Sequence, residues 1–392
     1  MFVKKAGKDW KSFVYIFVIA QLSIWHGGIS DFISEGLLSA WNKVQMFSIF
    51  VLIFTYIAKR KVPSYFTICI LLIRLWLAFV TYINNQPIDT VDLFRYSALV
   101  LLIDLYKDEI GKCIEPFMLI FEFMVYYNLY ICIQTGPDIY GAFYGSIGYD
   151  NDFTIYFIVA NFWSYLYFKV KRNWIRPLIL VGAIHFTLLY TWVITGLFAL
   201  IISDILLIVN MFCKLHISLF KTYMIYIVAE IMIVFIKIQN LFQFFITSIL
   251  KKDMTFSGRT NDWDNAINII ISNPFSFIFG HGNLSQEAEK AILGDVYCHN
   301  SFLEQFFRGG FVYWILFLLM IFMISKRVKY SKDIYSCNQQ LIICICALWV
   351  AGITESLFER YIVCVPMCAL YAAAYSKLTH KMNSNRQYKL YS

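Results

Sequence analysis

The sequence predicts an all-α, polytopic membrane protein: a bundle of about twelve transmembrane helices with one long extracytoplasmic loop that contains a short amphipathic helix. Composition is the first observation behind this prediction, because 60% of the 392 residues are hydrophobic and only 15% are charged. Soluble domains average about 25% charged residues, so a soluble protein is excluded. Long apolar segments recur along nearly the whole chain, and residues 1–392 are therefore expected to form a single integral membrane domain.

The apolar segments are long enough for helices that cross a hydrocarbon layer of about 30 Å. The expected spans lie at Phe13–Ile29, Val44–Ala58, Ser64–Ile83, Val91–Leu105, Ile114–Gln134, Phe153–Phe168, Ile175–Tyr190, Gly196–Met211, Tyr223–Phe245, Phe302–Ile324, Ile334–Gly352 and Tyr361–Tyr375. The basic segment Met1–Lys11 precedes the first span without a small-residue cleavage site, so we expect a retained span and not a removed signal peptide.

The basic residues set the expected orientation. Lys and Arg gather in alternate connections, at Lys59–Lys61, Lys169–Arg176 and Lys326–Lys332, and near both termini. Basic loops stay on the cytoplasmic side, so both termini are expected in the cytoplasm. This asymmetry accounts for the net charge of +8 without a nucleic-acid partner. The ten cysteines are scattered without CxxC pairs, and we expect them to be small apolar residues of the core.

Two connections stand out by their length and are both expected outside: Thr135–Asp152 and Thr247–Asn300. The larger one, residues 247–300, is predicted to carry the chemistry, because long loops in compact proteins are usually functional. Within it, Trp263, Ala266 and Ile270 recur at helical spacing ahead of Asn273-Pro274. This pattern predicts the amphipathic helix, lying on the membrane or on the bundle.

Arg259 directly precedes this predicted helix, where unpaired backbone N–H groups and the helix dipole favour an anion. A cation at that position gains nothing from the helix itself. Its placement makes sense if the arginine and the helix end share a bound phosphate, to which an arginine fork is well suited. A surface salt bridge from Arg259 to Asp262 or Asp253 is the alternative explanation.

His299 stands where the tenth span begins, and Ser301 with Glu304 forms the S-x-x-E pattern of a capping box. The positive end of that helix would keep the His299 ring neutral and able to take a proton near pH 7. The alternative is an interfacial histidine with a half-buried ring. The turn Gly280-His281-Gly282-Asn283 can bring backbone close to a ligand, although a glycine-bracketed turn is more often structural.

Two arginines interrupt apolar spans, where an unpaired charge costs several kcal/mol. We expect Arg74 to pair with a carboxylate such as Glu122. Arg95 either pairs with Asp92 or points at an anionic headgroup, and the sequence does not separate these two possibilities.

The stretch Phe256–Leu318 carries a resemblance to a known family. It contains the string S-G-R-x3-W-x9-N-P, then G-x-G, then H-N-S-F-L-E at the start of a span, followed by Gly309-Gly310. Together with the overall topology, this pattern resembles the O-antigen polymerase and O-antigen ligase superfamily, glycosyltransferases of the bacterial envelope. The resemblance implies ten to twelve spans and a large external loop that has an arginine at its start and a histidine at its end.

The resemblance also implies roles for these residues. Arg259 would hold the diphosphate of an undecaprenyl-linked oligosaccharide donor, and His299 would activate or position the acceptor hydroxyl. No cofactor and no obligatory metal are implied, and the sequence has no HExxH, Walker A or paired acidic metal motif. The residues expected to support the site are Asn300, Glu304, Gly280 and Gly282.

One departure from the family pattern concerns a second arginine. Ligases of this kind usually carry it in a Thr-rich stretch at a span start, where this chain has Thr191-Trp192-Val193-Ile194-Thr195-Gly196. Its absence weakens the ligase interpretation and leaves Arg95, Arg74 or Arg308 as second contacts to the diphosphate. Arg308 follows Glu304 by one helical turn and can simply pair with it.

The leading expectation is an O-antigen or related polymerase that joins lipid-linked repeat units at the outer face of the bacterial cytoplasmic membrane. A ligase that transfers finished glycan to a lipid A core is the first alternative. A lipid-linked sugar flippase or transporter is the second, and it predicts Gly/Pro-interrupted helices in symmetric halves. The chain has only seven prolines, which does not favour transport. Whether a chain-length regulator protein binds stays open.

Overall fold

The structure is a computed structural model of the chain. The residues described are 10–24, 31–139, 141–213, 216–238, 259–295, 297–330, 337–357 and 360–374. The first part contains α1 (Trp10–Ile24), α2 (Glu35–Ala58), α3 (Tyr65–Ile83), α4 (Thr90–Leu105), the 3₁₀ turn η2 (Lys107–Lys112) and α5 (Ile114–Thr135). The hairpin β1 (Tyr144–Gly145) and β2 (Gly148–Tyr149) leads into α6 (Asp150–Lys171), α7 (Ile175–Tyr190) and α8 (Ile194–Cys213). The last part contains α9 (Leu219–Glu230), the π turn η3 (Ile231–Phe235), α10 (Arg259–Ser272), α11 (Pro274–Phe279), α12 (Gln286–Leu293), α13 (Ser301–Tyr330), α14 (Cys337–Gly352) and η6 (Tyr361–Val363).

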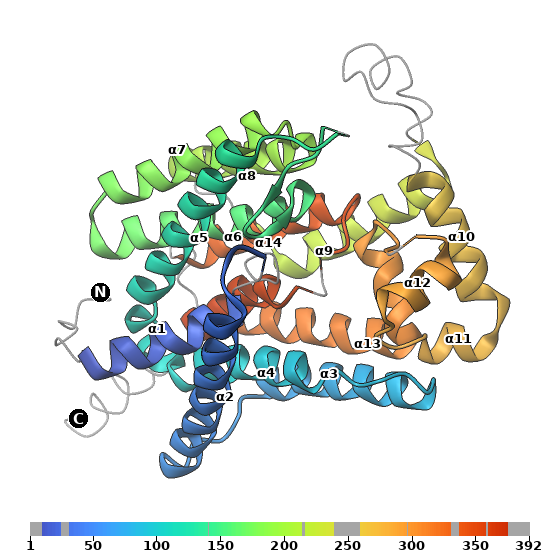
Figure 1. Cartoon of the computed structure of the whole chain (residues 1–392), viewed down its shortest axis with the longest axis horizontal. Coiled ribbons are helices and arrows are strands. Elements are labelled where there is room, and N and C mark those ends of the chain that lie inside the picture. Colours follow the sequence, from blue (N-terminus) through green and yellow to red (C-terminus); the bar gives the residue numbers. More distant parts are fainter. Residues whose placement is uncertain are drawn as a thin grey trace.

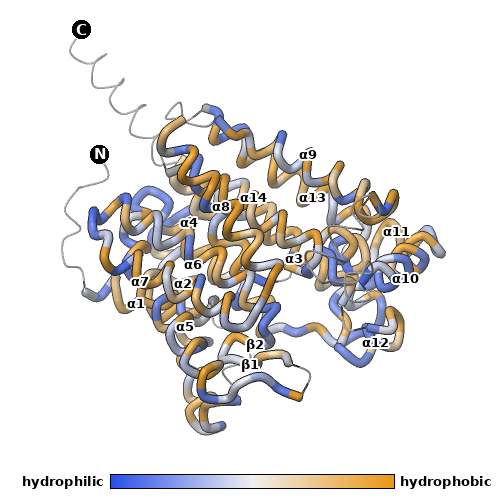
Figure 2. The backbone as a smooth tube through the Cα atoms, turned by 90° about the horizontal axis from the view of Figure 1, so that it is seen from above, coloured by the Kyte–Doolittle hydropathy of each residue, from blue (hydrophilic) through white to orange (hydrophobic). Residues whose placement is uncertain are grey.

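The predicted all-α class is confirmed, since most of the described residues are helical (Figure 1). Four of the described helices are long and apolar enough to cross a membrane: α2, α3, α5 and α13. Shorter apolar helices lie at Trp10–Gln21, Ile175–Tyr190, Ile194–Asn210, Asn338–Gly352 and Cys364–Ala374. Figure 2 shows hydrophobic residues along most of the bundle, and hydrophilic residues around α10 and α12 as well as on the opposite side, beside α1. The chain is thus a helical protein with the character of a membrane-embedded one, and the number of about twelve spans stays a prediction.

Several helix limits differ from the predicted spans because local capping decides where a helix starts. α2 begins at Glu35, well before Val44, since the Ser34 hydroxyl accepts a hydrogen bond from the Leu37 N–H. α13 continues to Tyr330, beyond the predicted end of its span. Parts of the predicted first, ninth and eleventh spans fall at residues 25–30, 239–245 and 334–336, which lie outside the described residues.

The predicted pairing of Arg74 with Glu122 is wrong. Glu122 instead binds Arg176 at the start of α7, with 2.5 Å between Oε2 and Nη2, and the same guanidinium reaches Glu115. Arg176 can serve both carboxylates because they lie on α5 two turns apart and its fork carries several donors. The Arg74 guanidinium lies 3.8 Å from the centre of the Tyr96 ring, a cation–π contact.

Arg95 donates hydrogen bonds to two side chains of α2. Its Nε and Nη2 donate to the side-chain oxygens of Gln45 and Asn42 on α2, each at 3.0 Å. Arg95 therefore helps to join α4 to α2, and its hydrogen bonds direct it to that part of the bundle.

α13 is broken near its start. Gly310 has φ +64, which interrupts the helical hydrogen-bond pattern. The carbonyl groups of residues 307–309 accept hydrogen bonds from the backbone N–H of His281 and Gly282 and from Nε1 of Trp76. The break thus lets the connection between α11 and α12 and the neighbouring α3 bind directly to the α13 backbone.

Gly280 and Gly282 make this contact possible. Both have positive φ, +80 and +79, and a Cβ at Gly280 would collide with the backbone of Arg308 and Gly310. A Cβ at Gly282 would collide with the backbone of Thr81. The expectation that this turn is structural is confirmed, since it packs backbone against backbone.

Candidate active site

Residues 259–300 fold into three short helices, α10, α11 and α12, which lie together at one end of the bundle (Figure 1). The sequence predicted only the first. α11 follows directly because Asn273 caps it and Pro274 occupies its first position. α12 begins at the cap Ser285 and ends at Gly294, which has φ +83. Residues 247–258 of the predicted loop lie outside the described residues.

The predicted amphipathic helix is α10, and it packs on the bundle. Trp263, Ala266 and Ile270 are buried on one face, as their spacing predicted. Arg259 is the first residue of this helix and does not precede it. Because α10 packs on the bundle through its buried face, the Arg259 side chain at its start has a fixed position.

Arg259 binds two groups near the end of the chain. Its Nη2 lies 2.9 Å from Oε1 of Glu355, and its Nη1 donates to the carbonyl oxygen of Thr354 at 2.5 Å. The salt bridge to Asp262 is therefore not the one formed, and Asp253 lies outside the described residues. Glu355 is buried, and this burial raises the pKa of its carboxyl to about 7 although the charge of Arg259 opposes the shift.

Arg259 is one of several residues that hold the segment 353–357 against the start of α13. Asn300 donates to the Ile353 carbonyl, and the Ser301 hydroxyl donates to the Glu355 carbonyl while accepting from the Leu357 N–H. The Ser356 hydroxyl donates to the carboxylate of Glu304. Every residue of this segment has a polar contact to α10 or to the beginning of α13, so its backbone is fixed beside Arg259.

The start of α13 differs from the predicted capping box. Asn300 is the cap, since its Oδ1 accepts from the Leu303 N–H at 2.9 Å. Ser301 is the first residue of the helix, and Glu304 accepts from the Cys298 N–H at 2.9 Å. The predicted capping box is therefore wrong. Asn300, and not Ser301, occupies the N-cap position, because its side chain accepts the hydrogen bond from the first turn.

His299 lies in the turn just before α13 and has φ +47. Its carbonyl accepts from Nε1 of Trp263, and its Nε2 lies 3.6 Å from Oδ2 of Asp295. The pKa of the ring is lowered, first by burial and then by the charge of Arg259, while Asp295 and Asp262 oppose the shift. The lowered pKa supports the expectation of a neutral His299 ring. Its causes are burial and the charge of Arg259, whereas the sequence had suggested the positive end of the helix.

Three side chains in this region have suitable atoms for a cation. The ligand atoms of Asp262, Asp295 and His299 all lie within 4.8 Å of one another. Two carboxylates and a neutral imidazole can ligate a divalent ion. The expectation that no metal is obligatory rests on the resemblance alone.

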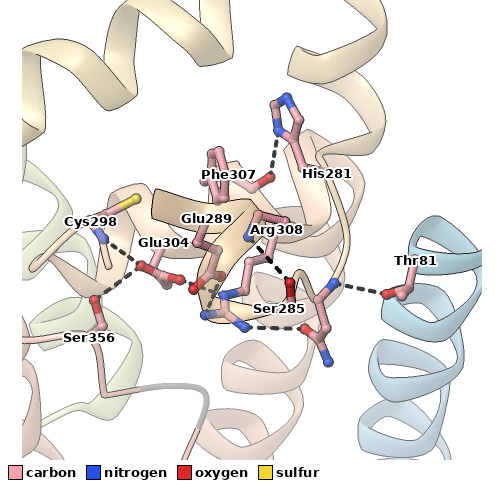
Figure 3. Close-up of polar contacts among 11 residues, drawn as sticks. Thr81, His281, Ser285, Glu289, Cys298, Glu304, Phe307, Arg308 and Ser356 are labelled. Carbon is pink, nitrogen blue, oxygen red and sulfur yellow. Dashed lines mark hydrogen bonds and ion pairs between the residues drawn. The ribbon is translucent and has the colours of Figure 1, made fainter. Parts of the chain in front are cut away.

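Arg308 is held by two buried carboxylates (Figure 3). Its Nε lies 2.5 Å from Oε1 of Glu304, which confirms the predicted pairing, and its Nη2 lies 2.7 Å from Oε1 of Glu289 on α12. Burial raises the pKa of Glu289 to about 7, against the effect of Arg308. Through these two ion pairs Arg308 joins α12 to α13, and a diphosphate at Arg308 would have to compete with both carboxylates.

The structure brings Arg259, His299, Asn300 and Glu304 together around one helix start. Gly280 and Gly282 adjoin the same helix through the break at Gly310. The hydrogen bonds of Arg95 go to Gln45 and Asn42 on α2, and not to Arg259, His299, Asn300 or Glu304.

Sequence reasoning missed several residues of this region. Besides Glu355 and Glu289, they include Arg360, whose Nη2 lies 2.8 Å from Oδ1 of Asp152. The Arg360 guanidinium is 6.0 Å from the centre of the Tyr297 ring, which stands edge-on to the ring of His299. The available signal was the charged run Glu355 to Arg360 between two apolar segments.

No family model matches the chain, and no match is found among curated proteins. Function is therefore inferred from the site itself and from the sequence pattern around it. The arrangement offers a cation at the start of α10 and, just before α13, an imidazole whose pKa is lowered.

Proposed function

We propose that this protein is an O-antigen or related surface-polysaccharide polymerase of the bacterial cytoplasmic membrane. It joins undecaprenyl-diphosphate-linked repeat units at the outer face, in a bundle of about twelve spans with both termini in the cytoplasm. The observation that carries the proposal is the proximity of Arg259 and His299. These residues stand at opposite ends of the described loop, and yet the charge of Arg259 is close enough to lower the pKa of His299.

The proposed glycosyl transfer requires a cation and a base, which are Arg259 and His299. The bond between the donor sugar's C1 and the diphosphate oxygen breaks, and the acceptor hydroxyl oxygen forms the new glycosidic bond to C1. Arg259 stabilises the negative charge on the departing undecaprenyl diphosphate with its donor fork. His299 orients the acceptor hydroxyl and takes its proton, which a neutral imidazole can do near pH 7. The positive charge for the leaving group comes from Arg259, and the proposed transfer requires no metal ion.

The test uses a deletion strain complemented with wild type, Arg259→Ala, His299→Ala or the control Lys290→Ala, at equal membrane levels. Lys290 is an exposed cation of α12, so its loss should leave the glycan ladder unchanged. We expect wild type to restore a multi-rung ladder on a gel. Both site variants should leave a single capped repeat unit, because each lacks a group needed for transfer.

Two other outcomes have distinct meanings. A deletion strain that accumulates a full ladder on the undecaprenyl carrier would identify a ligase. Site variants indistinguishable from wild type would remove Arg259 and His299 from the chemistry and end the proposal for this loop.

A further inference from the structure

The donor fork of Arg259 is already occupied in the structure. One terminal nitrogen holds the Glu355 carboxylate at 2.9 Å and the other holds the Thr354 carbonyl at 2.5 Å. The side chain of Arg259 is 15% exposed and that of Glu355 is 9% exposed. An anion that arrives at Arg259 therefore meets a guanidinium already paired with a buried carboxylate, and must compete with that carboxylate and not merely with water.

We propose that Glu355 is a positioning residue that competes with the donor diphosphate for Arg259. It holds the guanidinium while the site is empty, releases it when the diphosphate binds, and takes it back as undecaprenyl diphosphate leaves. This inference rests on the proposed function only for the identity of the anion.

The backbone around Glu355 allows such an exchange. Ser301 fixes the segment 353–357 by donating to the Glu355 carbonyl at 2.6 Å and accepting from the Leu357 N–H at 2.9 Å. Neither bond involves the Glu355 carboxylate. The carboxylate can thus give up Arg259 while the main chain of the segment stays in place.

The charges around Glu355 disfavour a carboxylate without Arg259. Asp152 and Asp150, at the start of α6, both raise the pKa of Glu355, and Arg259 lowers it. Arg360 forms its ion pair with Asp152. When a diphosphate takes Arg259, the Glu355 carboxyl therefore binds a proton, so the displaced group remains buried in its neutral form.

Exchange also explains how the product can leave. The leaving group carries the same diphosphate as the donor, so an arginine without a competitor would hold the product as firmly as the substrate. A carboxylate that returns to Arg259 weakens the product complex and shortens its lifetime.

The experiment measures binding of undecaprenyl diphosphate to the full-length protein in lipid nanodiscs. Variants are Glu355→Gln, Arg259→Ala, the double variant and the control Glu287→Gln, an exposed glutamate of α12. We expect Glu355→Gln to bind about tenfold more tightly, because a charge-assisted competitor has been removed. Glu287→Gln should bind like wild type, and Glu355→Gln should have no effect once Arg259 is absent.

Turnover gives a second readout that a structural role would not produce. Glu355→Gln should lower KM for the donor and lower kcat at the same time, because the product leaves more slowly. If Glu355→Gln does not yield folded protein, Glu355→Asp replaces it. The shorter side chain weakens the pair with Arg259, so binding about twofold to threefold tighter than wild type is expected.

Weaker or unchanged binding by these folded variants would overturn the inference, because Glu355 would then only fix the segment 353–357. Wild type that fails to bind undecaprenyl diphosphate would overturn it as well, whatever the glycan ladder shows. A ladder that identifies a ligase, together with tighter binding by Glu355→Gln, would reject the polymerase and leave the competition standing, since both reactions release the same diphosphate.

Discussion

At the scale of the residue, the decisive groups are charges buried against other charges. Arg308 has two carboxylate partners that are almost fully buried, whereas Arg259 has one carboxylate and one carbonyl. Removing an ion from such a pair costs several kcal/mol, because the remaining charge has lost its partner. The two arginines therefore differ in how they are held. Protonation of Glu289 still leaves Glu304 paired with Arg308, whereas the single carboxyl partner of Arg259, Glu355, can be neutralised by one proton.

The pH dependence of donor binding follows from this difference. The pKa of Glu355 lies at about 7, raised by burial. Below that pH the protonated carboxyl competes less for Arg259, while a diphosphate diester keeps its charge. We expect the affinity of wild type for an undecaprenyl-diphosphate-linked sugar, which is such a diester, to increase as the pH falls from 8 to 6.

The control for this pH dependence is Glu355→Gln, whose affinity should stay level over the same range. The measurement is a series of binding titrations in nanodiscs at fixed ionic strength. A wild-type affinity that decreases toward low pH would contradict the sign of this effect.

Sequence spacing revealed local pairs and not distant ones. Glu304 and Arg308 are one turn apart on a single helix, so their ion pair was predicted. Glu355 lies 96 residues from Arg259, and the helix dipole near Arg259 pointed to an anion without saying which. A buried partner from another part of the chain leaves no periodic trace, which is why Glu355 and Glu289 were missed.

At the scale of the element, α13 is the helix on which the site depends. Its first turns carry Ser301, Glu304 and Arg308, and its break at Gly310 exposes carbonyl groups to the turn between α11 and α12. Apolar periodicity predicted α10 and α13 because both have a buried face. It missed α11 and α12, which are too short for a period and are instead marked by the caps Asn273 and Ser285.

The break in α13 gives a stability prediction. Gly310→Ala places a Cβ at φ +64, where it would collide with the backbone of Ile278 and Gly280. We expect a loss of several kcal/mol of stability, seen as a lower thermal unfolding midpoint in detergent and less folded protein in the membrane.

Gly182→Ala on α7 is the matched control, since nothing lies within 4 Å of the added Cβ and the backbone is helical. That substitution should be neutral or slightly stabilising. Equal unfolding midpoints for Gly310→Ala and wild type would show that α13 tolerates a continuous helix at this point.

At the scale of the whole molecule, hydrophilic residues gather at α10 and α12, at one end of the apolar bundle (Figure 2). The membrane character was predictable because the lipid bilayer itself requires an apolar composition and long apolar segments, whatever the tertiary contacts are. The exact spans were not, since polar caps and breaks set where each helix ends.

The proposed orientation places α12 outside and the connection after α2 inside. Glu287→Cys should react with a membrane-impermeant thiol reagent in intact spheroplasts, whereas Lys59→Cys should react only after permeabilisation. Both positions are exposed in the structure. The unsubstituted protein, with its own cysteines, gives the background. The reverse labelling pattern would contradict the orientation.

The place of the segment 353–357 in the chain has a consequence for biosynthesis. The ribosome adds Glu355 long after Arg259, when α10 to α13 have already been made. Until then Arg259 and Ser301 lack the partners that complete their surroundings. A nascent chain can therefore carry the whole external loop while the partners of Arg259 and Ser301 are still to be made, so the site is completed only late in synthesis.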